Sequence, residues 1–358
     1  MRIAFADYIL ARSSHALQPA LKQLGNWETG LVASQLRSIQ VSRPVFICGL
    51  ARSGSTILLE LLSQIAGVAT HRYRDFPFQA IPWIWNNYLN RFQVNSEPVE
   101  RPHADRIRIT RESPEAMEEP LWMMFFNHLH STCTSQLLTE ATACPEFSRF
   151  FDEHLRKMLL IRGGQRYVAK NNYNVGRIAF LARLYPDAQF IVPIRHPVSH
   201  VHSLVSQHIR FCEYARIQPR VAAYLQAAGH FEFGPQRIPI QFDSTAANRT
   251  LEHWTRGDNH RGYAVQWNEV YGYVQHLFEN DQQLAQQIHV VRYEDFCSAP
   301  EKVFTNLLQQ AGLAETCPLS LDHISAIDST KTLSAEIQDA IWREVDTVAT
   351  NLGFTRDE

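Results

Sequence analysis

The chain has 358 residues, of which 45% are hydrophobic and 20% are charged, and its formal net charge at pH 7 is −2. This balance excludes an intrinsically disordered chain, and the lack of a polybasic stretch excludes general binding to nucleic acid. No run approaches the roughly 18 apolar residues that a membrane-spanning helix needs.

The amino terminus and the cysteines bear on the compartment. The opening segment MRIAFADYILARSSHALQPAL has polar and charged residues where a signal peptide has an unbroken apolar core, which predicts a cytoplasmic protein. The six cysteines are scattered and form no Cys-x-x-Cys pair, so the sequence indicates neither a zinc site nor a disulfide framework.

The chain begins with helical periodicity in residues 1–42. Apolar spacing at 8–24 and 28–39 predicts two packing helices. A buried strand is predicted at 44–49 and a helix at 55–65, joined by a glycine-containing loop. These elements form one unit, which we bound at residues 43–70.

Strands and helices alternate again in residues 166–211 and 288–312. Strands are predicted at 166–170, 188–194 and 288–293, and helices at 174–185, 197–211 and 300–311. The alternation predicts an α/β fold, in which a parallel β-sheet has helices on both faces, and we interpret residues 1–358 as a single domain. Ligands of open parallel sheets bind at the carboxyl ends of the strands.

The loop after the first strand has the outline of a phosphate-binding P-loop. It reads Gly49-Leu50-Ala51-Arg52-Ser53-Gly54-Ser55-Thr56, so Ser55 stands where the P-loop lysine is expected, and the basic residue is Arg52. Backbone N–H groups of such a turn converge on an anion at the helix amino terminus. Arg52 can bind a terminal phosphate-like group without a metal. The alternative is a turn whose glycines only allow tight packing.

A second anion site is predicted at the end of the 188–194 strand. Arg195 follows that strand, and Ser203 comes eight residues later in the next helix. A long guanidinium and a hydroxyl about two helical turns away can bind one anion. Two anion sites at two strand ends predict a ligand with two separated anionic groups.

This pair of sites resembles the sulfotransferases that use 3'-phosphoadenosine 5'-phosphosulfate (PAPS). In that family the 5'-phosphosulfate loop reads like Gly-x-Pro-Arg-Ser-Gly-Thr-Thr, and an arginine and a serine eight residues apart bind the 3'-phosphate. The segments at 185–191, YPDAQFI, and 291–296, VRYEDF, are also similar to family motifs. The resemblance covers residues 43–312 and implies a P-loop-like sulfotransferase fold.

The resemblance also implies site residues and a reaction. The PAPS-binding residues are predicted to lie in the loop and at the later strand ends: Arg52, Ser53, Gly54, Ser55, Thr56, Arg195, Ser203 and Tyr293. Tyr293 corresponds to a tyrosine near the adenine, and Lys170 to a lysine that touches the transferring sulfuryl group. An acceptor hydroxyl or amine then attacks the sulfur, and adenosine 3',5'-bisphosphate leaves, with no metal involved.

The general base is the least defined part of this prediction. After Lys170 the chain reads Asn171-Asn172, where some relatives have a histidine. Asp75 is the first candidate, ahead of His71 and Glu119, although Asp75 would have a structural role if it pairs with a nearby arginine. The acidic stretch at 112–119 offers further carboxylates.

Two insertions, residues 71–150 and 212–260, are expected to form the acceptor pocket or a lid, because loops this long are usually functional or contain helices. The acceptor is predicted to be a small molecule, a lipid or a sugar. Two other functions stay open: a P-loop kinase or NTPase, and a nucleotide-binding protein without catalysis.

Overall fold

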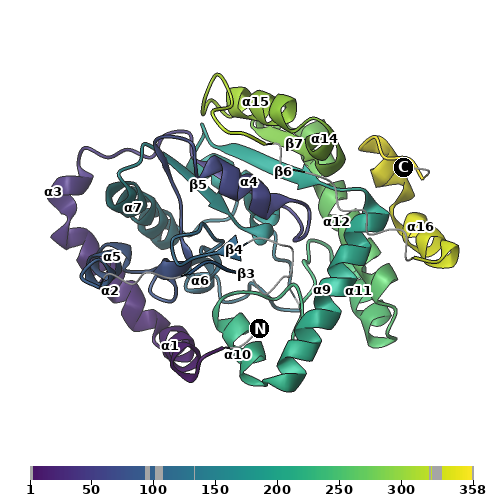
Figure 1. Cartoon of the computed structure of the whole chain (residues 1–358), viewed down its shortest axis with the longest axis horizontal. Coiled ribbons are helices and arrows are strands. Elements are labelled where there is room, and N and C mark those ends of the chain that lie inside the picture. Colours follow the sequence, from purple (N-terminus) through teal and green to yellow (C-terminus); the bar gives the residue numbers. More distant parts are fainter. Residues whose placement is uncertain are drawn as a thin grey trace.

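The computed structural model describes residues 3–92, 97–100, 108–132, 134–321, 324 and 333–356. Parts of the predicted insertion at 71–150 therefore lie outside the described residues. Figure 1 shows a central sheet with helices packed around it, and the amino-terminal helices on the side of the molecule away from the carboxyl terminus.

The main sheet has five strands in the order β2-β5-β1-β6-β7, and every pairing is parallel. The strands are β1 (Val45–Ile47), β2 (Val68–Ala69), β5 (Arg166–Lys170), β6 (Gln189–Ile194) and β7 (Ile288–Arg292). A separate antiparallel pair joins β3 (Val99–Glu100) to β4 (Arg108–Ile109). The predicted α/β fold with a parallel sheet is confirmed.

The side-chain alternation of β1 divides the core into two layers. Val45 and Ile47 pack in one cluster with α4 (Ser55–Leu62) and α15 (Pro300–Gln310). Phe46 points to the opposite face, where the second cluster includes α7 (Pro145–Arg162), α8 (Ile178–Leu184) and α12 (Asn259–Asn280). Helices therefore cover both faces of the sheet, and the site residues at the strand ends rest on a rigid core.

The remaining helices surround this core (Figure 1). They are α1 (Phe5–Ala16), α2 (Gln18–Leu31), α3 (Ala33–Leu36), α5 (Pro82–Leu89), α6 (Glu119–Met123), α9 (Pro197–Ile217), α10 (Arg220–Ala227), α11 (Ser244–Thr255), α13 (Gln282–Ala285), α14 (Tyr293–Ser298) and α16 (Ala335–Asn351). Within the described ranges, no helix combines the length and the apolar composition that crossing a membrane requires.

Several helices begin or end at other residues than predicted, because tertiary contacts or local chain geometry set their limits. The helix predicted at 197–211 continues to Ile217, and the one predicted at 174–185 begins as a 3-10 helix, Asn172–Arg177. The amino-terminal helices break at Leu17, directly before an α2 that has proline in its first turn. The two-residue β2 was not predicted, because so short a strand has no readable period.

Candidate active site

The loop between β1 and α4 has a backbone conformation that depends on its glycines. Gly49, Arg52 and Gly54 all have positive φ angles, of 132°, 71° and 99°. A Cβ atom at Gly54 would lie 2.9 Å from the ring of Tyr293, so the loop and Tyr293 are in direct contact. The Ser53 hydroxyl donates to the Leu50 carbonyl at 2.8 Å and ties the turn together. The loop therefore leads into the amino terminus of α4, where backbone N–H groups are available to an anion.

The two predicted anion sites lie side by side. The Arg52 Nε donates to the Ser203 Oγ at 3.3 Å, which joins the loop to α9. The Arg195 guanidinium lies over the Tyr293 ring, 4.9 Å from its centroid. Burial lowers the pKa of Arg195, and the positive charge of Arg52 acts in the same direction. The carboxyl ends of β1 and β6 thus bring two guanidinium groups and one hydroxyl to one region.

Lys170 approaches the same helix terminus from the end of β5. Its Nζ donates to the Thr56 Oγ1 at 3.0 Å, and the backbone of Lys170 is in register with Ile47 of β1. The Glu115 carboxylate is 3.9 Å from the Lys170 Nζ. Lys170 is therefore a buried cation next to the first turn of α4 and not a solvated strand-end charge.

Asp75, the favoured base candidate, lies in a buried ion pair. Both of its carboxylate oxygens accept from the Arg162 Nη2, at 2.6 and 2.7 Å, and the His71 Nδ1 is 3.3 Å away. Burial raises the pKa of Asp75, but the contacts with His71 and Arg162 outweigh it and lower that pKa to about 2. His71 is itself buried and stacked on His154. This geometry argues for a structural role of Asp75 and His71.

Glu119 is enclosed in the same way. It accepts two hydrogen bonds from Arg177, both at 2.8 Å, and one from Asn171 at 2.7 Å, and its Oε1 is 2.6 Å from the His130 Nε2. Burial raises the pKa of Glu119, but Arg177 and His130 lower it to about 2. A buried carboxylate so fully engaged is poorly suited to accept a proton from a substrate.

Three further titratable residues lie around the end of β5. The Glu115 carboxylate is 3.9 Å from the Lys170 Nζ, the charge of Lys170 acts on His230, and Glu232 accepts a hydrogen bond from Asn172. Glu115 belongs to the acidic stretch at 112–119. His230 and Glu232 belong to the insertion at 212–260, and their pattern in the sequence has no feature that separates them from other polar residues. Only the folded chain brings them to the end of β5.

The histidines after Arg195 support the site. The His200 Nε2 donates to the Ala51 carbonyl at 2.8 Å, so α9 braces the loop. Burial lowers the pKa of His200 to about 3, so this imidazole is neutral at physiological pH. Among the residues that the structure describes, no group of three His, Cys, Asp or Glu side chains has the arrangement of a metal site.

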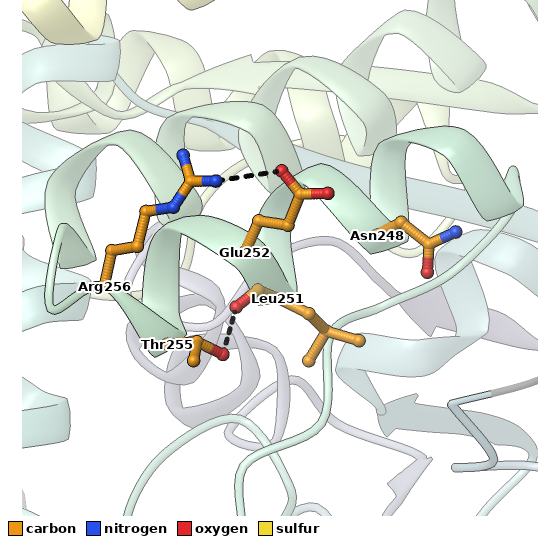
Figure 2. Close-up of a pocket in the computed structure, with 5 residues that line it drawn as sticks. All are labelled: Asn248, Leu251, Glu252, Thr255 and Arg256. Carbon is orange, nitrogen blue, oxygen red and sulfur yellow. Dashed lines mark hydrogen bonds and ion pairs between the residues drawn. The ribbon is translucent and has the colours of Figure 1, made fainter.

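Figure 2 shows a hollow on α11, and none of the site residues described above lines it. It is lined by Asn248, Leu251, Glu252, Thr255 and Arg256, which all come from one face of that helix and the residue after it. The Glu252 and Arg256 side chains form an ion pair at 3.9 Å along that face. A hollow formed by one helix face brings no groups together from different elements, so we assign it no function.

The chain is similar to known sulfotransferases. A family model described as "Sulfotransferase family" matches residues 44–316. No curated protein is similar enough to count as a match.

Similar solved structures include three bacterial sulfotransferases. The one from Mycobacterium tuberculosis H37Rv is 16% identical, covering 93% of this chain and 82% of that chain, with a TM-score of 0.43. The one from Mycobacterium avium is 13% identical, covering 89% of this chain and 81% of that chain, with a TM-score of 0.47. The one from Alicyclobacillus acidocaldarius is 15% identical, covering 87% of this chain and 95% of that chain, with a TM-score of 0.43. Because these identities and TM-scores are low, the assignment to the sulfotransferase family depends on the family-model match over residues 44–316.

Proposed function

The chain belongs to the sulfotransferase family, and from that premise we propose that it transfers the sulfuryl group of PAPS to a hydroxyl or amine of a small acceptor. The family membership makes the protein a sulfuryl-transferring enzyme. The donor, the acceptor and the residue roles are our proposal.

One observation carries the choice of donor: the hydrogen bond between Arg52 and Ser203. PAPS has anionic groups at both the 5' and the 3' positions of one ribose, so its two binding sites must be neighbours. Arg52 and the amino terminus of α4 would bind the 5'-phosphosulfate, and Arg195 with Ser203 would bind the 3'-phosphate. Tyr293, which contacts both Gly54 and Arg195, would contact the nucleoside.

Lys170 would act on the transferring group. The acceptor oxygen or nitrogen attacks sulfur as the bond from sulfur to the bridging oxygen breaks, and adenosine 3',5'-bisphosphate leaves with that electron pair. Negative charge grows on the bridging oxygen in the transition state, so cationic donors aimed there lower the barrier. Lys170 and Arg52, together with the N–H groups of Ser53 to Thr56, supply such donors.

We propose that both insertions belong to one domain and contribute to its acceptor side. Glu115 comes from the insertion at 71–150 and His230 from the insertion at 212–260. The negative charge of Glu115 helps to raise the pKa of His230. We propose that a small molecule, lipid or sugar enters between these segments and Lys170.

The kinase or NTPase alternative fits the loop less well. The side chain that would reach the β- and γ-phosphates in a P-loop is a lysine, and this chain has Ser55. A nucleotide-binding protein without catalysis would have the same donor site as a sulfotransferase, and it would differ only in showing no turnover.

Ligand-induced stabilisation tests the proposal. A ligand that binds only the folded chain raises the melting temperature, by an amount that grows with its concentration relative to Kd. Adenosine 3',5'-bisphosphate is expected to raise it more than equimolar ADP or magnesium ATP. An equal or larger shift with magnesium ATP would favour the kinase alternative.

A further inference from the structure

His230 and Glu232 form a pair beside the proposed sulfuryl site. The His230 Nδ1 is 3.7 Å from a Glu232 carboxylate oxygen. The other Glu232 oxygen accepts a hydrogen bond from the Asn172 Nδ2 at 2.7 Å, two residues after Lys170 in the chain. The His230 side chain is 38% exposed and that of Glu232 only 8%, so the imidazole is the accessible member of the pair.

The backbone around this pair is held firmly. Gly229 has a φ of 77°, and a Cβ atom there would lie 2.7 Å from Glu119, so the chain passes close to the buried Glu119 cluster. The Phe231 N–H donates to the Tyr173 hydroxyl at 3.0 Å, and the Tyr263 hydroxyl donates to the Glu232 carbonyl at 2.9 Å. Contacts on both sides of His230 therefore fix its position, as a catalytic group requires.

His230 is linked to the phosphosulfate loop through Glu232 and Asn172, because Asn172 follows Lys170 by two residues. Lys170 donates to Thr56 of α4 and lies 3.9 Å from Glu115. Three charged groups act electrostatically on the His230 imidazole: Glu232 from its own loop, Glu115 from the first insertion and Lys170 from β5. His230 is therefore near the end of β5, close enough to Lys170 for the ammonium charge to act on its imidazole.

We propose that His230 is the general base of the transfer and that Glu232 is its positioning residue. This inference rests on the proposed function. As the acceptor oxygen forms its bond to sulfur, its proton moves to the His230 Nε2, on the ring edge opposite Glu232. The resulting imidazolium is stabilised by the Glu232 carboxylate and later loses the proton to water.

The other groups near Lys170 fit this role less well. The Glu115 carboxylate already accepts hydrogen bonds from the Tyr73 hydroxyl and from the Ala116 N–H, and its side chain is only 9% exposed. The His230 side chain, at 38% exposed, is more accessible. Burial lowers the pKa of His230, but its contact with Glu232 and the charges of Glu232 and Glu115 outweigh this and raise it. A raised pKa makes the neutral imidazole a stronger proton acceptor.

The kinetic test uses PAPS as the probe and water as the acceptor, because sulfate release then needs no identified substrate. His230→Asn is expected to lower the rate by about 10²- to 10⁴-fold, the usual contribution of general base catalysis, while the Kd of adenosine 3',5'-bisphosphate changes less than twofold. The control is His276→Gln, an exposed histidine on α12, which is expected to leave both values unchanged. Release by His230→Asn within threefold of the wild-type rate overturns the assignment, as does a larger loss in Glu115→Gln than in His230→Asn.

A spectroscopic test distinguishes a positioning role of Glu232 from a merely structural one. In the NMR spectrum of the full chain, the His230 ring is expected to titrate above its usual pKa of about 6.5, and Glu232→Gln is expected to lower that pKa. The acid limb of the rate profile then moves to lower pH in Glu232→Gln, because the base must be neutral. An unchanged His230 pKa in this variant rejects the pair. Failure of the wild-type chain to bind adenosine 3',5'-bisphosphate would reject the proposed function instead, and the NMR result would still stand.

Discussion

Arg52 and Ser203 are 151 positions apart in the chain, and the Arg52 Nε donates to the Ser203 Oγ at 3.3 Å. This contact joins the loop after β1 to the helix after β6, two neighbouring strands of the sheet. Because parallel strands end at the same edge, each strand contributes the residue that follows it to one site. The adjacency of the two clusters is what a ligand with 5'- and 3'-anionic groups requires.

Arg195→Ala is expected to weaken binding of adenosine 3',5'-bisphosphate by about 10- to 100-fold, since a hydrogen bond to a charged group contributes about 1.5–3 kcal/mol. Binding of ADP, which has no 3'-phosphate, should change much less. The matched control is Arg216→Ala on the following helix α9, where the side chain is 74% exposed and pairs with Glu213 on the helix surface. Titration calorimetry with the two nucleotides measures the difference. An equal loss for both ligands would remove Arg195 from the 3'-phosphate site.

Gly54→Ala is expected to disrupt the loop. The φ of 99° is unfavourable for a residue with a Cβ, and the new atom would lie 2.9 Å from the Tyr293 ring. Strain of this kind costs about 1–3 kcal/mol. We expect a lower melting temperature and weaker nucleotide binding. Gly30→Ala is the control, because its Cβ would meet nothing within 4 Å and alanine is favoured in a helix. A Gly54→Ala variant as stable as Gly30→Ala would contradict this account of the loop.

The sequence predicted the anion-binding residues at the strand ends better than the residues around the proposed general base. Gly49 to Thr56, Arg195 and Ser203 could be recognised because loop, strand end and helix are close in sequence, and the structure places these groups together. Four of the five sheet strands were also predicted, because each has enough consecutive apolar residues to show a strand pattern.

Contacts between residues far apart in the sequence could not be predicted from local patterns. The Arg162 partner of Asp75 is 87 positions away, whereas the neighbouring Arg72 and Arg74 pair with Glu112. His230 reaches the end of β5 only through packing of the second insertion. Local sequence therefore suggested Asp75 as the base, and the tertiary contacts favour His230.

Asp75→Asn tests whether that carboxylate is structural. Its pKa is lowered from 3.8 to about 2, so its ionised form stabilises the fold above pH 4, and this contribution of about 2 kcal/mol is lost as the pH falls from 4 towards 2. The substitution leaves Arg162 buried without its partner, which usually costs about 3–5 kcal/mol. Urea unfolding at pH 7 and pH 3 should show a destabilised variant whose difference from wild type shrinks at low pH.

The control for Asp75 is Asp152→Asn on α7, the helix that also carries Arg162. Asp152 pairs with Arg156 across one helical turn, and both side chains are about one-third exposed, so we expect a change within about 0.5 kcal/mol. If Asp75→Asn kept wild-type stability but lost sulfate release from PAPS, Asp75 would act in catalysis and not in folding.

Lys170→Met separates transition-state stabilisation from nucleotide binding. The Lys170 Nζ contacts Thr56 at the first turn of α4, where the sulfuryl group of PAPS is proposed to lie. Loss of one preorganised donor usually lowers turnover by about 10²- to 10³-fold. Adenosine 3',5'-bisphosphate lacks the sulfuryl group, so its Kd should change less than threefold. The comparison is Lys302→Met, an exposed lysine on α15, with sulfate release from PAPS and calorimetry run on both variants. A large increase in the bisphosphate Kd with unchanged turnover would place Lys170 at a phosphate and not at the sulfur.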